Sequence, residues 1–227
     1  MYSLVWFTSR LSALACASTL FFTLGVAVPA AAKQAPLNHQ QALQALGHAD
    51  PLRRLEGIVR LADIGTAADA DALMPSLQDA DPTLRQMALG IIWRLWGRSG
   101  DAAIDKLYQQ GLGLMQSGNL PKAVAVFSHI IRQRPAFAEA WNKRATLYYM
   151  LDEYDLSMQD CDEVLKRVPN HFGALSGYAQ MLAGRDQPER ALELLERSYR
   201  INPNVGNAHV MMEGLRRQIE ARRRNSV

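Results

Sequence analysis

Cysteine is almost absent from this sequence, and where the two residues fall excludes a disulfide-stabilised fold. The 227 residues contain only Cys16 and Cys161. Cys16 lies in an apolar leader whose removal would leave Cys161 alone, so the mature chain could form no intramolecular disulfide. Stability must therefore come from the packing of hydrophobic side chains, which supply 48% of the residues.

A large excess of either charge is also missing. The chain has 25 Lys and Arg against 22 Asp and Glu, and losing Arg10 with the leader would lower the net charge from +3 to +2. So balanced a chain argues against wholesale binding of nucleic acid, which needs a basic surface.

Basic residues gather only near the end of the chain, where Glu213 and Glu220 interrupt them. We expect this arginine tail to be a solvated helix end, whose cations favour the helix dipole. Contact with anionic lipid headgroups, glycans or nucleic acid is the alternative. The tail comprises Arg216, Arg217, Arg222, Arg223 and Arg224.

Recognisable catalytic signatures are missing as well. The sequence has no phosphate-binding loop, no Gly-x-Ser-x-Gly elbow and no His-Glu-x-x-His helix. The five histidines, at 39, 48, 129, 171 and 209, share no metal-ligand spacing. We therefore expect no metal, no cofactor and no enzymatic activity. An envelope-remodelling enzyme component with an unrecognised active site is one alternative, and a lipid- or glycan-binding factor is another.

A long apolar run occurs only at the beginning. Arg10 is the one charged residue in the stretch 1–32, and the stretch 11–28 is apolar or small throughout. Pro29 ends the run, and Ala30 to Ala32 offer the small residues that signal peptidase reads. We predict a signal peptide over residues 1–32 and export, most readily to a bacterial periplasm. An uncleaved membrane anchor, lipid attachment at Cys16 and secretion are the alternatives.

A 34-residue register runs without gaps through the second half of the chain. Small residues recur where two helices must approach closely, large apolar residues recur between helix layers, and a proline ends each unit. The aligned sets are Leu107, Trp141 and Leu175; Gly111, Ala145 and Ala179; Leu114, Tyr148 and Leu182; Ala123, Ser157 and Ala191; Phe127, Cys161 and Leu195; and Pro135, Pro169 and Pro203.

This pattern resembles the tetratricopeptide repeat family, whose helix-turn-helix unit has the same length. The resemblance covers residues 104–204 and implies three units, at about 104–137, 138–171 and 172–205. The chain departs from the family pattern at Gln110 and Arg144, where Leu is usual, and at Pro188, which replaces an aromatic residue.

A second, 31-residue period precedes the first. Asp50-Pro51 and Asp81-Pro82 are related by it, as are Arg54 and Arg85. Each Asp-Pro pair predicts a helix start, with Asp as N-cap and Pro as the first helical residue. The pattern resembles short HEAT-like repeats and implies two units over residues 37–100.

The expected fold is therefore all-α: a solenoid of two HEAT-like units, three tetratricopeptide units and a C-terminal capping helix within residues 206–227. Residues 97–100 are the only candidate linker, and they are too few to separate the halves. We expect one continuous solenoid, with Trp93 and Trp96 buried where the two repeat types meet.

The resemblance also implies a binding surface. In this family the first helices of successive units line a concave groove that holds partners. Carried onto this sequence, the groove positions form a mixed apolar and amide-bearing surface, suited to an extended or helical protein segment. These positions are Tyr108, Leu112, Met115, Asn142, Thr146, Tyr149, Ser176 and Gln180. The sequence thus predicts an exported, noncatalytic adaptor, with membrane contact only through an uncleaved signal or the arginine tail.

Overall fold

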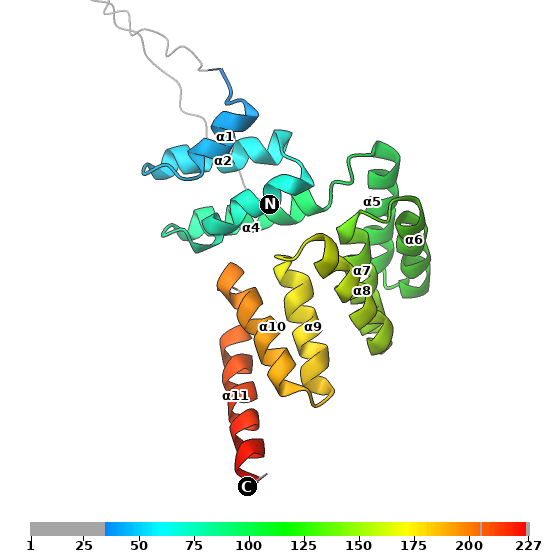
Figure 1. Cartoon of the computed structure of the whole chain (residues 1–227). Coiled ribbons are helices and arrows are strands. Elements are labelled where there is room, and N and C mark those ends of the chain that lie inside the picture. Colours follow the sequence, from blue (N-terminus) through cyan, green and yellow to red (C-terminus); the bar gives the residue numbers. More distant parts are fainter. Residues whose placement is uncertain (1–34, 205, 226–227) are drawn as a thin grey trace, which may run out of the picture. The chain divides into compact units, whose positions relative to one another are not determined.

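The computed structural model describes residues 35–204 and 206–225, and all regular secondary structure in these ranges is helical (Figure 1). This confirms the expected all-α fold. The predicted signal peptide lies outside the described residues. No helix within the described ranges is long and apolar enough to cross a membrane.

The N-terminal region contains two long helices that begin as predicted. α2 (Pro51–Ile64) is capped by Asp50, and α4 (Pro82–Trp96) is capped by Asp81, each carboxylate accepting a hydrogen bond from a backbone N–H of the first turn. α1 (His39–Ala45) precedes the first of them. The stretch before α4 is not one helix, because Pro75 interrupts it. It consists of η1 (Ala67–Asp69), α3 (Ala70–Leu73) and η2 (Met74–Gln78).

The two arginines related by the 31-residue period have the same structural role. Arg54 donates to the carbonyl oxygens of His48 and Ala49, which lie just before the first Asp-Pro pair. Arg85 donates in the same way to Asp79 and Ala80, just before the second pair. Each arginine thus satisfies the carbonyl groups of the turn that precedes its own helix.

Three helix pairs follow, in the register that the 34-residue period predicts (Figure 1). Neighbouring helices along the chain pack against each other. The pairs are α5 (Ala102–Gln116) with α6 (Leu120–Gln133), α7 (Ala138–Met150) with α8 (Tyr154–Arg167), and α9 (Phe172–Gly184) with α10 (Pro188–Ile201).

Small residues in this register are required by close helix contact. A Cβ added to Gly111 would lie 2.6 Å from the Phe127 ring, so only glycine fits there. In the next unit Ser157 Oγ donates a 2.7 Å hydrogen bond to the carbonyl oxygen of Ala145. The short serine side chain on α8 thus reaches the backbone of α7, which requires the two helices to lie close together.

The final helix, α11 (Ala208–Asn225), packs against α10. Its buried face contains Met212, Leu215 and Ile219. Val210, on another side of the helix, is 65% exposed and does not belong to this face.

The N-terminal helices meet the repeats at an unexpected place. Their hydrophobic core takes in Phe172 at the start of α9, with Val168 and Ile201 packed against it. Two hydrogen bonds reinforce this contact: Gln78 Nε2 donates to the carbonyl oxygen of Arg200, and Asn204 Nδ2 donates to that of Leu77. The halves are thus joined through the third 34-residue unit. The continuous solenoid expected from the sequence would instead have placed the N-terminal helices against the first unit.

Candidate functional site: a pocket between the first helices of the second and third units

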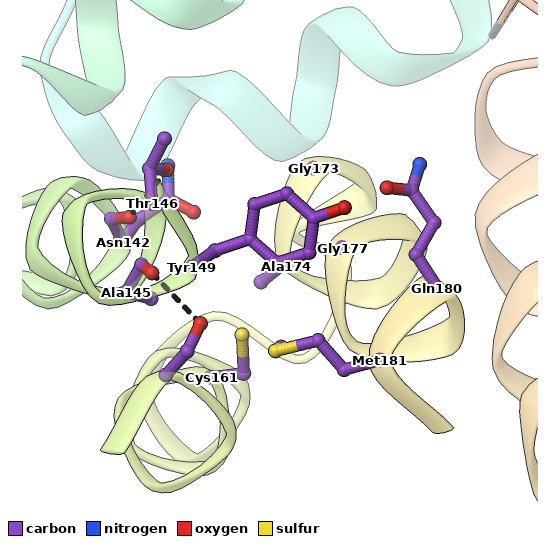
Figure 2. Close-up of a pocket in the computed structure, with 11 residues that line it drawn as sticks. Asn142, Ala145, Thr146, Tyr149, Cys161, Gly173, Ala174, Gly177, Gln180 and Met181 are labelled. Atoms are coloured by element: carbon purple, nitrogen blue, oxygen red, sulfur yellow. Dashed lines mark hydrogen bonds between the residues drawn. The ribbon is translucent and has the colours of Figure 1, made fainter. Parts of the chain in front are cut away.

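A pocket of about 170 Å³ opens between α7 and α9 (Figure 2). Four of the predicted groove residues line it: Asn142, Thr146 and Tyr149 from α7, and Gln180 from α9. The remaining lining residues are Ala145, Ser157, Cys161, Gly173, Ala174, Gly177 and Met181.

The pocket exists because small residues face each other across the two helices. Ala145 lies on α7, and Gly173, Ala174 and Gly177 lie on α9. A Cβ added to Gly177 would have no atom within 4 Å, so the absence of a side chain there leaves open space. A methyl group at this position would meet no atom, and a larger side chain would take up space that the pocket now leaves open.

The floor of the pocket includes two sulfur-containing side chains, Cys161 and Met181. In Figure 2 the sulfur atoms of Cys161 and Met181 lie beneath the Tyr149 ring. Burial, together with the nearby carboxylates of Asp160 and Asp162, raises the pKa of the Cys161 thiol to about 12. The thiol is therefore neutral at physiological pH and presents an apolar surface.

The rim is more polar and more exposed than the floor. The Tyr149 ring extends from α7 toward Gly177 of α9 and is 44% exposed (Figure 2). Thr146 Oγ1 donates to the carbonyl oxygen of Asn142 within its own helix, while Gln180 is exposed on α9. A ligand would meet an aromatic face on one side and an amide on the other.

A buried polar cluster lies beside the pocket, centred on Glu139 in the first turn of α7. Its carboxylate accepts from His171 Nε2 at 3.0 Å, from Lys143 Nζ at 2.8 Å and from the Asn142 amide at 3.1 Å. Tyr108 Oη lies 3.5 Å away. Asn142 thus uses its amide nitrogen inside the protein, so that group is not the free donor to a bound peptide that the sequence suggested.

The histidine of this cluster has a defined tautomer. His171 Nδ1 accepts a 3.0 Å hydrogen bond from the backbone N–H of Ala174, where it caps α9. The proton of the neutral ring is therefore on Nε2, which donates to Glu139. The His171 side chain is fully buried, and the Glu139 side chain is 1% exposed.

The charge of Glu139 is stabilised by its partners. Burial alone would raise its pKa, but the hydrogen bond from His171 and the positive charge of Lys143 outweigh that effect and lower the pKa to about 2. Glu139 is therefore an ionised, fully paired carboxylate at physiological pH.

Two tryptophans of α4 cover this cluster. Trp96 stacks on His171 with ring centroids 4.0 Å apart, and the Trp93 ring lies beneath the Lys143 ammonium at 5.2 Å. A Cβ added to Gly173 would lie 2.5 Å from Trp93. The tryptophans are therefore packing residues where the two halves of the chain meet, as predicted, and they cover the N-terminal ends of α7 and α9.

The remaining predicted residues lie outside the pocket. Tyr108 and Leu112 border a second, more open hollow of about 370 Å³, together with Trp93, Arg94 and Lys143. The Tyr108 ring itself is buried and packs edge-on against Phe127 and Phe137. Met115 and Ser176, both half-buried, line neither hollow.

Sequence reasoning did not find Glu139, Lys143 or His171. Asn142 and Lys143 follow Glu139 by three and four residues on α7, but Tyr108 lies on α5 and His171 caps α9, and no local spacing relates these two to Glu139. One signal was available: Glu139 coincides in the 34-residue register with Asp105 and Gly173, so it faces the groove side of its helix. Within the described ranges, no three His, Cys, Asp or Glu side chains are arranged to hold a metal ion.

The geometry defines an all-helical repeat solenoid with a small pocket between α7 and α9, the first helices of the second and third 34-residue units. A tetratricopeptide repeat family model matches residues 108–171, which confirms the resemblance seen in the sequence for this part of the chain.

Two relatives extend this comparison. A TPR repeat-containing protein of Rhizobium etli is 34% identical over 134 residues, which cover 59% of this chain and 66% of that protein. Anaphase-promoting complex subunit 7 of Dictyostelium discoideum is 25% identical over 87 residues, 38% of this chain and 15% of that protein. The chain thus spans less than two thirds of either relative.

Solved structures share the fold. The Sgt2 TPR domain from Aspergillus fumigatus has a TM-score of 0.50 with this chain at 20% identity, over 56% of this chain and 85% of that domain. A likeness at this level of identity concerns the arrangement of helices alone.

Proposed function

We propose that this protein is an exported, noncatalytic adaptor that holds a segment of a partner protein across α7 and α9. The observation that carries the proposal is the pocket between these helices, with its apolar floor and its polar rim. Repeat solenoids commonly bind partners on the surface formed by successive units.

The size of the pocket favours one side chain of a larger partner. Its volume of about 170 Å³ is close to the roughly 150 Å³ cavity that accommodates a benzene molecule. Pockets that enclose a whole small-molecule ligand usually measure about 300–1,000 Å³. An apolar side chain therefore fits, while the rest of the partner segment would lie along the rim near Tyr149 and Gln180.

The proposal is tested by filling the pocket. The full chain is used to select binders from a random-peptide library, and affinities of the selected peptides are compared between wild type and Gly177→Leu. We expect a loss of at least tenfold, because burial of one Leu- or Phe-sized side chain contributes about 1.5–3 kcal/mol.

Gly113→Leu is the matched control. Gly113 is also a helical glycine with no atom within 4 Å of an added Cβ, but it lies on α5 outside the pocket. Equal binding by both variants and wild type, or failure of wild type to enrich any peptide, would refute the proposal.

Export is the part of the proposal supported by the sequence pattern of the stretch 1–32. Expression of the full gene in bacteria, followed by fractionation and mass spectrometry of the N-terminus, tests it. We expect a periplasmic product beginning at Lys33. An intact N-terminus in the membrane fraction would favour the uncleaved anchor, and an intact N-terminus in the cytoplasm would exclude export.

A further inference from the structure

The turn between α7 and α8 is unusually apolar for an exposed segment. Seven large hydrophobic side chains are exposed in the described part of the chain, and four of them lie within this one turn and its flanks. They are Tyr149, Met150, Leu151 and Leu156. Tyr149 is also part of the pocket rim, so this apolar surface begins where the pocket ends.

The other two repeats show that the fold does not require apolar residues here. Met150 and Leu151 coincide with Gln116 and Ser117 in the first unit and with Gly184 and Arg185 in the third. Leu156 coincides with Lys122 and Arg190. The middle unit has therefore exchanged polar positions for exposed hydrophobic ones, which is typical of an interaction surface.

The turn is held firmly. Leu151 and Glu153 donate backbone hydrogen bonds to carbonyl groups of the last turn of α7, and Asp152 adopts a left-handed conformation with φ of 61°. The Tyr154 hydroxyl donates to the Asp152 carboxylate, and its ring lies edge-on to Tyr149 at 5.6 Å. The apolar side chains are thus presented on an ordered turn.

The same turn is acidic. Residues 150–156 contain Asp152, Glu153 and Asp155 and no cation, whereas the equivalent residues carry one lysine in the first unit and balanced charges in the third. Arg185 pairs with Asp155. Asp152 and Glu153 remain as exposed carboxylates beside the apolar side chains.

We infer that the partner segment held in the pocket continues over the α7–α8 turn with a further apolar side chain and at least one Lys or Arg. This inference rests on the proposed adaptor function and specifies the partner's chemistry. The apolar residue lies against Met150, Leu151 and Leu156, and the cation lies near Asp152 and Glu153. The carboxylates disfavour an anionic membrane surface at this position.

Two turn variants test the inference with the peptides selected on wild type. Met150→Gln/Leu151→Ser/Leu156→Lys transplants the residues of the first unit, and its control is Leu52→Ser/Val59→Gln, which removes exposed apolar side chains on α2. Asp152→Asn/Glu153→Gln removes the charges, and Asn tolerates the left-handed conformation. Its control is Asp71→Asn/Glu220→Gln, at exposed positions on other helices.

We expect the selected peptides to be rich in apolar residues and in Lys or Arg. The apolar transplant should weaken binding about tenfold. The charge variant should weaken it about threefold and should abolish most of the salt dependence seen with wild type, because exposed charge pairs are screened by salt. Both controls should bind as wild type does, and far-UV circular dichroism should show equal helix content.

The outcomes separate the two proposals. Peptides that are lost with Gly177→Leu but bind both turn variants with unchanged affinity would overturn this inference and leave the adaptor function standing. Peptides that Gly177→Leu binds as tightly as wild type does would refute the proposal that the pocket holds the partner. Concentration-dependent self-association that the turn variants abolish would identify a second copy of this chain as the occupant and would also overturn the inference.

Discussion

His171 Nε2 lies 3.0 Å from Glu139 Oε2, and this hydrogen bond joins the first helix of the second repeat to the start of the third in a region closed to solvent. Lys143 forms an ion pair with the same carboxylate, the Asn142 amide donates a hydrogen bond to it, and Trp96 stacks on the imidazole. The ends of α7, α9 and α4 are thus held by one polar cluster.

Glu139→Gln should therefore destabilise the protein strongly. The amide removes the negative charge that pairs with Lys143 and keeps only part of the hydrogen bonding, and breaking a buried pair in this way costs about 3 kcal/mol. Urea denaturation measures the change in the free energy of unfolding. The control is Asp155→Asn, which breaks the exposed ion pair with Arg185 and should change stability by less than about 1 kcal/mol. A Glu139→Gln protein as stable as this control would contradict the assigned role.

The pH dependence follows from the lowered pKa of Glu139. Its pKa is about 2 in the folded protein against an ordinary 4.5, so the folded state favours the ionised form. This contribution to stability is fully present above about pH 4.5 and is lost as the pH falls toward 2. Unfolding free energy measured across this window should fall more steeply for wild type than for Glu139→Gln. Parallel curves would show that Glu139 does not carry the effect.

Two glycines of α9 should respond in opposite directions to the same substitution. Gly177→Ala places a methyl group in open space and should raise stability by about 1 kcal/mol, or the melting temperature by about 3 °C. Gly173→Ala places it 2.5 Å from Trp93 and should destabilise by about 1–3 kcal/mol. Differential scanning calorimetry on both proteins tests the pair, and a stabilising Gly173→Ala would show that Trp93 does not pack there.

Cys161 should be unreactive in the native protein. Its side chain is buried and the pKa of its thiol is raised to about 12, so almost no thiolate is available to attack. Titration with an aromatic disulfide reagent at pH 8 should label the thiol rapidly in denaturant and only slowly without it. Fast labelling of the folded chain would mean that the floor of the pocket opens.

The sequence periods predicted the fold correctly because each period arises from contacts within one repeat unit. Asp50 and Asp81 cap the helices that follow them, and the small residue at Ala145 faces Ser157 in the same unit. The sequence pattern was therefore enough to locate the starts of α2 and α4 and the α7–α8 pair. Four of the eight predicted groove residues line one pocket, because the register fixes which side of α7 and α9 faces outward.

The rest depended on contacts that no sequence period encodes. Glu139 finds His171 only after two helices have packed, and Trp93 and Trp96 meet the third unit only through the docking of α4. Val210 and Met212 lie on different sides of α11, and which of them is buried depends on the partner helix. These features are tertiary, so local propensity could not supply them.

The two hydrogen bonds that join Leu77 and Gln78 to the end of the last repeat connect positions 127 and 122 residues apart. A simple repeat array couples each unit only to its neighbours, so units can be gained or lost during evolution with little effect elsewhere. Here, insertion of a fourth 34-residue unit before α9 would move His171 and Phe172 away from the tryptophans. The number of repeats is therefore fixed by the N-terminal helices, and this chain should unfold as one cooperative body instead of fraying unit by unit from its ends.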